Sequence, residues 1–168
     1  MVVWPESTEE VATVVRLAST HRISVIPRGG GSGVLGGAVP VRGGVVVDLT
    51  RMRRIRTLDG ENLLVTVEAG TLGQALEEAL NQRGFTCGHI PQSLALSTVG
   101  GWIAARSVGE FSTKYGPIEG IVVGLEVVLP WGEVWRSRSV PRTATGPRLV
   151  DLFMGAEGIL GIITAATL

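Results

Sequence analysis

Two kinds of hydrophobic spacing alternate along the chain, one typical of helices and one typical of strands. The first helical stripe runs from Val11 to Ala18, and Ser7 with Glu10 forms a capping-box pattern in front of it. This combination predicts a helix from about Thr8 to His21. The chain therefore begins with an amphipathic helix whose apolar face needs a partner.

Two further helices are expected in the middle of the chain. Thr71 and Gln74 form a second capping-box pair around the start of the apolar stripe 72–80, and Gly84 is placed to stop that helix. Another helix is expected to begin near Ser97-Thr98, despite the two glycines that follow.

The remaining apolar runs are short and rich in β-branched residues, which is typical of strands. The run at 23–26 ends at Pro27, and an Asp59-Gly60 pair divides two runs between Ile55 and Val67, as in a hairpin. We expect the other strands at 44–49, 118–129, 133–136 and 161–168, with a short helix near 149–154. The pattern therefore predicts a mixture of helices and strands, in an architecture that turns antiparallel at the hairpin between Ile55 and Val67.

Length and hydropathy fit one domain, or two small lobes that share a core. The chain has 168 residues, of which 45% are hydrophobic, and its mean hydropathy is +0.34. Its apolar runs stay well below the roughly 20 residues that span a bilayer, and its first residues do not read as a secretory signal. A soluble protein in the cytoplasm is the expectation, without a membrane span.

The charges balance, with 15 basic and 15 acidic residues, so no overall field favours nucleic acid or an anionic membrane. The one basic cluster, at 51–56, is expected to be a solvated turn and strand face rather than an anion site. Cys87 is the single cysteine, which excludes an internal disulfide and a cysteine-rich metal site. No metal site is expected.

Glycine is the outlier, at 24 residues, about twice the average usage of ~7%. Six of the nine positions from Gly29 to Gly37 are glycine, at a conformational cost of roughly 3–6 kcal/mol. Backbone N–H groups without Cβ interference can bind a phosphate, and such bonds offset that cost. We interpret the segment as an anion-binding loop, with a flexible linker as the alternative.

This loop does not fit the two best-known nucleotide motifs. Gly31, Gly33 and Gly36 match the spacing of a dinucleotide fingerprint, but no helix fits before the next strand, and Asp48 comes too early to bind the ribose. No Gly-Lys-Ser/Thr of a Walker loop occurs. Two more glycine-rich segments, 97–101 and 155–161, suggest that a large ligand lies across the molecule, with the first offering N–H groups at a helix start.

In order and spacing, the chain resembles the FAD-binding domain of the vanillyl-alcohol-oxidase and p-cresol-methylhydroxylase-like (PCMH-type) flavoproteins, which include D-lactate dehydrogenases and glycolate oxidase subunits. Within that group it is most similar to the alkyldihydroxyacetonephosphate synthases. The matching segments are 3–5, 27–33, 67–70, 88–91, 97–102, 115–119, 145–147 and 154–164.

The resemblance implies an α+β module of two lobes, about 1–50 and 51–168, with a small, mainly parallel sheet first and a larger antiparallel sheet second. FAD would lie between the lobes. The first glycine loop would wrap the pyrophosphate, residues 92–98 with Gly100-Gly101 would line the flavin and phosphates, and residues 105–108 would continue that wall. Glu119 and Ile121 would meet the adenosine side, and residues 157–163 would close over it. The implied binding residues are Pro27, Arg28, Gly29, Gly30, Gly31, Ser32, Gly33, Gln92, Ser93, Ser97, Thr98, Gly100, Gly101, Ala105, Ser107, Glu119, Ile121, Glu157, Gly158, Gly161 and Ile162.

Departures from the family pattern change what is expected. The first glycine loop contains no histidine, so FAD is expected to bind non-covalently. The cap or substrate domain of the family is not among these residues, so a partner subunit or further domain is expected to complete catalysis. His89 is the candidate acid–base residue, because imidazole titrates near neutrality, and a structural histidine is the alternative.

Three functions remain open. The first is a flavoprotein oxidoreductase in which FAD accepts a hydride from a small hydroxy acid or related organic substrate. The second is a transferase like alkyldihydroxyacetonephosphate synthase, without net redox change. The third is a non-catalytic FAD-binding subunit or fragment.

Overall fold

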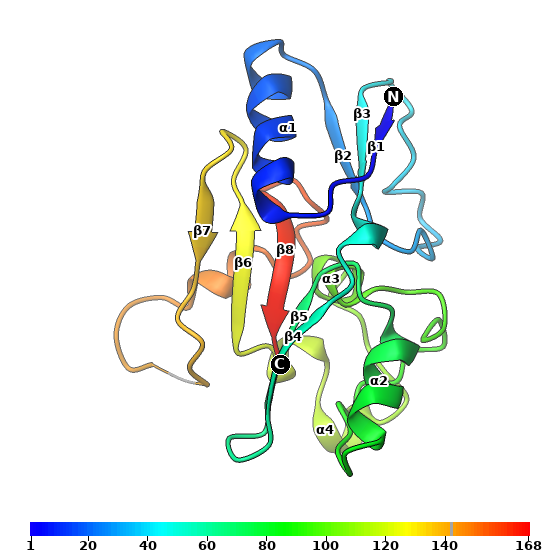
Figure 1. Ribbon diagram of the computed structural model, residues 1–168, viewed down its shortest axis with the longest axis vertical. Helices are drawn as coiled ribbons and strands as arrows, with labels where there is room; N and C mark the ends of the chain where they lie inside the picture. The colour runs from blue at the N-terminus through cyan, green and yellow to red at the C-terminus, as the bar shows by residue number, and fades with distance from the viewer. Residues whose placement is uncertain (142) are drawn as a thin grey trace.

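A computed structural model describes residues 1–141 and 143–168, and it shows an α+β arrangement of two sheets with helices (Figure 1). The elements are β1 (Val2–Val3), α1 (Thr8–Thr20), β2 (Val25–Arg28), β3 (Val45–Asp48), η1 (Leu49–Arg51), β4 (Ile55–Asp59), β5 (Leu64–Glu68), α2 (Gly73–Asn81), α3 (Val99–Ala104), α4 (Ser112–Tyr115), α5 (Ile118–Ile121), β6 (Gly124–Val128), β7 (Val134–Arg136), η2 (Leu149–Leu152) and β8 (Ile162–Thr167).

The smaller sheet is parallel, with strand order β1-β3-β2. Because β2 and β3 are parallel, the chain must run back from the end of β2 to the start of β3. The glycine-rich loop forms this connection. Ile26 pairs with Val46, and Arg28 pairs with Asp48 at the carboxyl end of the strands. The loop therefore leaves the sheet at the edge where ligands commonly bind in parallel sheets.

The larger sheet is antiparallel, with order β4-β5-β8-β6-β7. The hairpin prediction is confirmed, since Leu58 pairs with Val65 across the Asp59-Gly60 turn. The strand expected at 118–129 is wrong in its first part, because residues 118–121 form α5 and only Gly124–Val128 is strand. Pro117 precedes α5 and fixes a backbone angle suited to a first helical turn.

Local capping signals were right for α1 and wrong for α2. Ser7 Oγ accepts a hydrogen bond from the Glu10 N–H at 3.2 Å, as a capping box requires. Leu72 is the residue before α2, and Thr71 makes no cap; its hydroxyl is buried without a partner. The reason is tertiary, because the extended residue Leu72 bridges to Thr98 and takes the capping position itself.

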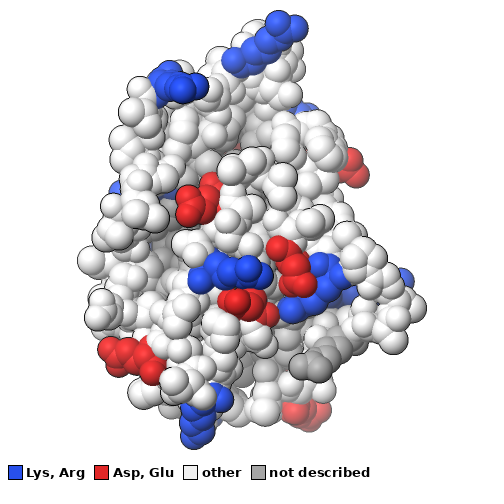
Figure 2. Space-filling model, turned by 180° about the vertical axis from the view of Figure 1, so that it is seen from behind, with Lys and Arg blue, Asp and Glu red and all other residues white. Residues whose placement is uncertain are grey.

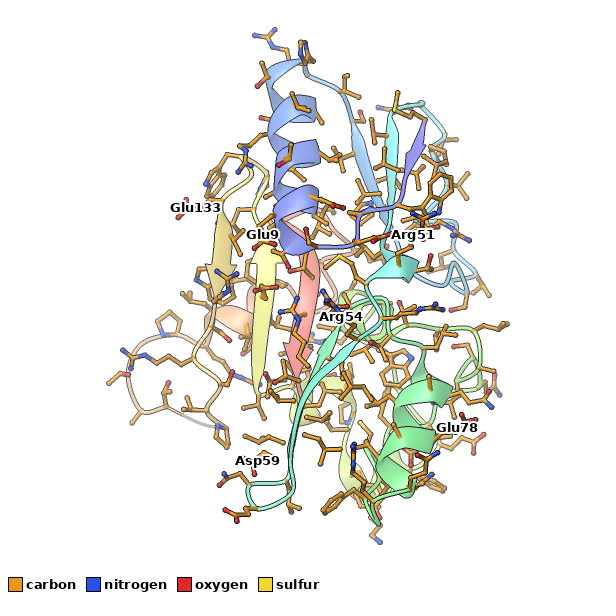
Figure 3. The ribbon with its side chains drawn as sticks, viewed as in Figure 1. Glu9, Arg51, Arg54, Asp59, Glu78 and Glu133 are labelled. Carbon is orange, nitrogen blue, oxygen red and sulfur yellow. The ribbon has the colours of Figure 1, made fainter. Side chains whose placement is uncertain are left out.

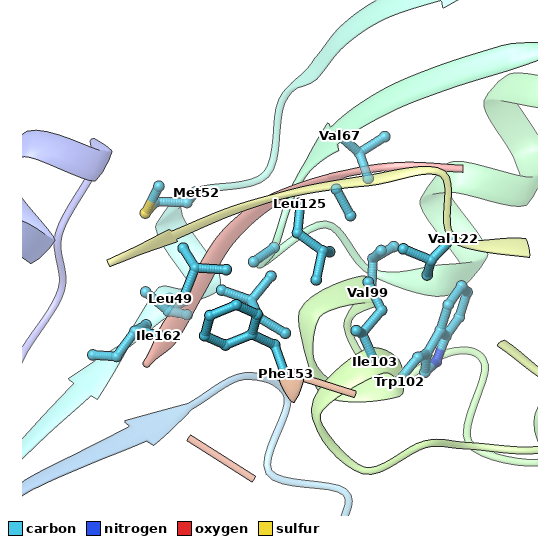
Figure 4. Close-up of a cluster of buried hydrophobic side chains, with 14 of the residues drawn as sticks. Leu49, Met52, Val67, Val99, Trp102, Ile103, Val122, Leu125, Phe153 and Ile162 are labelled. Carbon is cyan, nitrogen blue, oxygen red and sulfur yellow. The ribbon is translucent and has the colours of Figure 1, made fainter. Parts of the chain in front are cut away.

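One hydrophobic core joins the two sheets (Figure 4). Helix α1 packs against β6 of the larger sheet, and α3 packs against β5 and β8. Figure 4 shows Leu49 and Met52, which follow the small sheet, in the same cluster as Val67 and Leu125 of the larger one. Both sheets are therefore held in one body around the buried face of α3.

Two buried carboxylates of the larger sheet, Glu68 and Glu126, bind the arginines that precede and begin β4. Glu68 is 0% and Glu126 is 8% exposed. Arg54 and Arg56 reach Glu68 at 2.9 and 3.5 Å, and Arg56 also reaches Glu126 at 3.1 Å. Figure 3 shows Arg54 over the middle of the sheet. The basic cluster at 51–56 thus spans the turn before β4 and the start of that strand, as predicted, but Arg54 and Arg56 are tied to buried carboxylates.

The molecular surface carries mixed charge. On the face seen in Figure 2, basic and acidic side chains lie next to one another in the middle of the molecule. Among the residues that the structure describes, every helix falls short of the length and apolar character that crossing a membrane requires.

Candidate functional site

A cleft of about 440 Å³ lies between the glycine loop, α3 and the segment 155–161. This volume is within the range of roughly 300–1,000 Å³ found for small-molecule sites. The predicted binding residues that line it are Pro27, Arg28, Gly29, Gly30, Gly31, Ser32, Gly33, Ser93, Ser97, Thr98, Gly100, Gly101, Ala105, Ser107, Glu157, Gly158, Gly161 and Ile162. Three segments far apart in the sequence thus meet around one space.

The loop between β2 and β3 presents a row of backbone donors. Among the hydrogen bonds between described residues, none has a donor N–H from Gly29 to Ala38. Gly31 and Gly36 have φ of +68° and +76°, a left-handed conformation that lets successive N–H groups converge. A polar backbone without internal partners is suited to an anionic ligand, because such groups otherwise need water.

The glycines of this loop have two different roles. A Cβ on Gly30 would lie 1.8 Å from the Leu96 carbonyl oxygen, and one on Gly29 would lie 2.3 Å from Thr98 Oγ1. These two glycines are needed for packing within the protein, which sequence analysis did not foresee. A Cβ on Gly33 would meet no atom of the chain within 4 Å, so Gly33 alone of the three leaves open space.

An ion pair between Arg28 and Asp48 lies where the glycine loop leaves β2. The Arg28 guanidinium bonds to Asp48, and Asp48 also accepts from the Thr50 N–H at 3.0 Å. Burial raises the pKa of Asp48, but the hydrogen bonds from Thr50 and Arg28 outweigh that effect and hold the pKa below its ordinary value. Arg28 is 40% exposed and lines the cleft, so a fixed cation lies beside the loop donors.

The backbone N–H groups at the start of α3 already have hydrogen-bond partners within the protein. The Val99 N–H donates to the Thr71 carbonyl at 3.0 Å, and the Gly100 N–H donates to the Ala69 carbonyl at 2.8 Å. The prediction that these N–H groups are free for a ligand is therefore wrong. Their partners come from the β5–α2 connection, which only the folded chain brings to this place.

The segment 155–161 closes one side of the cleft by packing against α3 and β2. The N–H groups of Gly155 and Glu157 donate to the carbonyls of Ile103 and Ala104, both at 3.0 Å. A Cβ on Gly158, whose φ is +88°, would lie 2.5 Å from Pro27 Cγ. This segment holds the glycine loop in place.

Four predicted residues lie outside the lining of the cleft: Gln92, Glu119, Ile121 and His89. His89 is 1% exposed and its Nε2 lies 2.8 Å from Ser107 Oγ, so it stands behind the wall. Glu119 lies 3.4 Å from the Arg106 guanidinium.

The cleft also contains residues that sequence reasoning missed. They are Ala38, Leu49, Ala69, Trp102, Ala104 and Phe153. Val34, Leu35 and Gly37 also line the cleft but belong to the segment already interpreted as an anion-binding loop, and Ile163 ends the segment 157–163 that the resemblance implies. Val34 and Leu35, which are 95% and 90% exposed, had a local signal, since apolar side chains inside a glycine loop are unusual. Core residues such as Phe153 had none, because nothing in their neighbours along the chain distinguishes them from other packing residues.

Comparison with known proteins gives the same assignment at three levels. The family described as FAD binding domain matches residues 1–138. An uncharacterized FAD-linked oxidoreductase, YgcU, of Escherichia coli is 44% identical over 162 residues, which are 96% of this chain and 34% of that protein. A D-lactate dehydrogenase of Anaerostipes hadrus is 40% identical over 163 residues, again 96% of this chain and 34% of the relative.

The fold comparison agrees. A solved structure of alkyldihydroxyacetonephosphate synthase superimposes with a TM-score of 0.91 at 37% identity, covering 99% of this chain and 30% of that one. This chain spans about a third of the length of these relatives. The small parallel and larger antiparallel sheets that the resemblance implied are confirmed. The chain belongs to the family of FAD-binding domains, and FAD is the cofactor of that family.

Proposed function

We propose that this chain is the FAD-binding part of an oxidoreductase that removes a hydride from a hydroxy acid or related small organic substrate. The observation that carries the proposal is the row of unpartnered N–H groups from Gly29 to Ala38, at the mouth of a cleft with Arg28 beside it. Donors and a cation in this arrangement suit a diphosphate. The D-lactate dehydrogenase relative supports the substrate class.

The lining of the cleft supports non-covalent binding. It includes no histidine, cysteine or tyrosine among the described residues, the side chains that would be needed to attach a flavin. Its polar side chains are serines, threonine, one arginine and one glutamate, with Trp102 and Phe153 as the aromatic residues. When bound, FAD supplies the hydride-accepting chemistry, while these residues hold and orient it.

A titration of the purified chain with FAD tests binding directly. We expect saturable quenching of flavin fluorescence at a one-to-one ratio and a yellow protein after gel filtration. Chain denatured and kept unfolded serves as the control, because the site requires three distant segments. Absence of any retained flavin would refute the proposal.

Reduction of the bound flavin tests the substrate class. Anaerobic D-lactate or glycolate should bleach the flavin absorbance when the chain is assayed as the FAD-binding part of the oxidoreductase proposed above. The solved alkyldihydroxyacetonephosphate synthase structure favours a second function, a transferase without net redox change. Flavin that remains oxidised with every hydroxy acid tested would favour that transferase or a binding-only subunit.

Asp48 provides a prediction about the base of the loop. Asp48→Ala removes the partner of Arg28 and the acceptor for the Thr50 N–H, so the loop loses its fixed start. We expect a free energy of unfolding lower by about 2 kcal/mol, as for one partly buried charged network, and an FAD affinity reduced about tenfold. Asp151→Ala is the matched control, because its contact with Arg148 is exposed at the surface. Equal effects of the two variants would contradict the anchoring role.

A further inference from the structure

A buried polar pair stands behind the wall of the cleft. His89 is 1% exposed, and its Nε2 lies 2.8 Å from the hydroxyl oxygen of Ser107, which lines the cleft. The imidazole packs against Trp102 in a T-shaped pair, with ring centroids 4.9 Å apart and planes at 65°. The ring is therefore held in one orientation, with one nitrogen toward the cleft wall.

The surroundings of the second ring nitrogen, Nδ1, indicate which of the two nitrogens carries the proton. His89 Nδ1 is buried without a hydrogen-bond partner. Burial lowers the pKa of His89, and the negative charge of Glu119 opposes this only in part, so the ring is neutral near pH 7. A neutral imidazole has one N–H, and a buried N–H without a partner is rarer than a buried acceptor without one. The proton therefore belongs on Nε2, where it is donated to Ser107 Oγ.

This arrangement fixes the direction of the serine hydroxyl. An oxygen that accepts from His89 keeps its own proton for another acceptor. Among the described residues, the Ser107 hydroxyl has no other hydrogen-bond partner, and Ser107 is part of the cleft lining. The same preference is not imposed on Ser93, another serine of the cleft wall, since no histidine backs it.

We propose that Ser107 donates a hydrogen bond to an oxygen or nitrogen acceptor of the bound flavin nucleotide, and that His89 is the positioning residue that holds it in the donating state. The inference rests on the proposed binding of FAD in this cleft. It gives His89 a role through Ser107 in place of acid–base chemistry with a substrate.

A double-mutant cycle on the whole chain, with FAD as the probe, tests the proposal. Ser107→Ala should weaken FAD binding about tenfold, as the loss of one hydrogen bond predicts. His89→Phe keeps a ring against Trp102 but removes the donor, so it should weaken binding to a similar extent. The double variant should bind no more weakly than Ser107→Ala alone, because His89 acts through Ser107.

Further measurements separate positioning from a merely structural role. His89→Gln, which keeps an N–H donor, should restore the affinity to within about threefold of the wild type. The flavin absorption bands should shift alike in Ser107→Ala and His89→Phe. In a Ser93→Ala background, His89→Phe should keep its full effect, because that serine has no histidine behind it. Thermal unfolding without FAD identifies any variant that fails to fold.

The outcomes distinguish this inference from the proposed function. Additive losses in the Ser107 cycle, or a His89→Gln variant as weak as His89→Phe, would overturn the positioning role while leaving FAD binding intact. A wild-type chain that retains no FAD would overturn the proposed function itself.

Discussion

Replacing Gly33 with valine is expected to leave the fold intact and to weaken FAD binding about 100-fold. A Cβ at this position meets no atom of the chain within 4 Å, and Gly33 lines the cleft beside the loop N–H groups. Covering two N–H donors would remove two charge-assisted hydrogen bonds of roughly 1.5 kcal/mol each. Fluorescence titration gives the affinity, and thermal unfolding without FAD gives the stability.

Two other glycines provide matched controls. Gly120→Ala also adds a Cβ in open space, but in α5 and outside the cleft, so neither affinity nor stability should fall. Gly30→Ala places a Cβ 1.8 Å from the Leu96 carbonyl oxygen and should lower the free energy of unfolding by about 3 kcal/mol. An undiminished FAD affinity in Gly33→Val would show that the loop does not hold the nucleotide.

Removing Glu126 is expected to cause a large loss of stability, because this carboxylate is 8% exposed and bonds to side chains from α1, β4 and β7. Its carboxylate accepts from Thr8 at 2.6 Å and bonds to Arg56 and Arg136 at 3.1 and 2.7 Å. Glu126→Ala leaves both guanidinium groups without this partner and should lower the free energy of unfolding by about 3 kcal/mol, the lower end for a buried ion pair, because Arg136 is 58% exposed. Urea denaturation measures the change.

An exposed glutamate on the same sheet is the control. Glu133, at the β7 edge in Figure 3, bonds to the Trp131 indole at 2.9 Å on the surface, so Glu133→Ala should change stability by less than about 0.5 kcal/mol. Equal losses in the two variants would contradict the network at Glu126.

The Glu126 network also predicts an acid dependence. Burial raises the pKa of Glu126, but the hydrogen bonds from Thr8, Thr164 and Arg136 and the charge of Arg56 outweigh it and hold the pKa below its ordinary value of 4.5. The unfolded chain therefore takes up this proton at a higher pH than the folded chain. The contribution is complete above pH 4.5 and is lost as the pH falls further, so Glu126→Gln should flatten the stability curve there.

The sequence by itself determined the elements that local chemistry specifies. Ser7 and Glu10 begin α1, and Asp59-Gly60 turns the first hairpin, because each signal acts within a few residues. The glycine loop was also readable as an anion site, since a dense run of glycine has a cost that few other roles offset. The matched order of motifs along the chain identified the family.

Tertiary structure decided what depends on residues far apart. Thr71 does not cap α2, because Leu72, which bridges to Thr98, takes that position. The N–H groups expected to be free at α3 are bound to the carbonyls of Thr71 and Ala69. The need for Gly30 became visible only when Leu96 was placed against it. Such contacts form through packing across the chain, which neither spacing nor composition encodes. The partnership of His89 with Ser107, 18 residues later in the chain, arises in the same way.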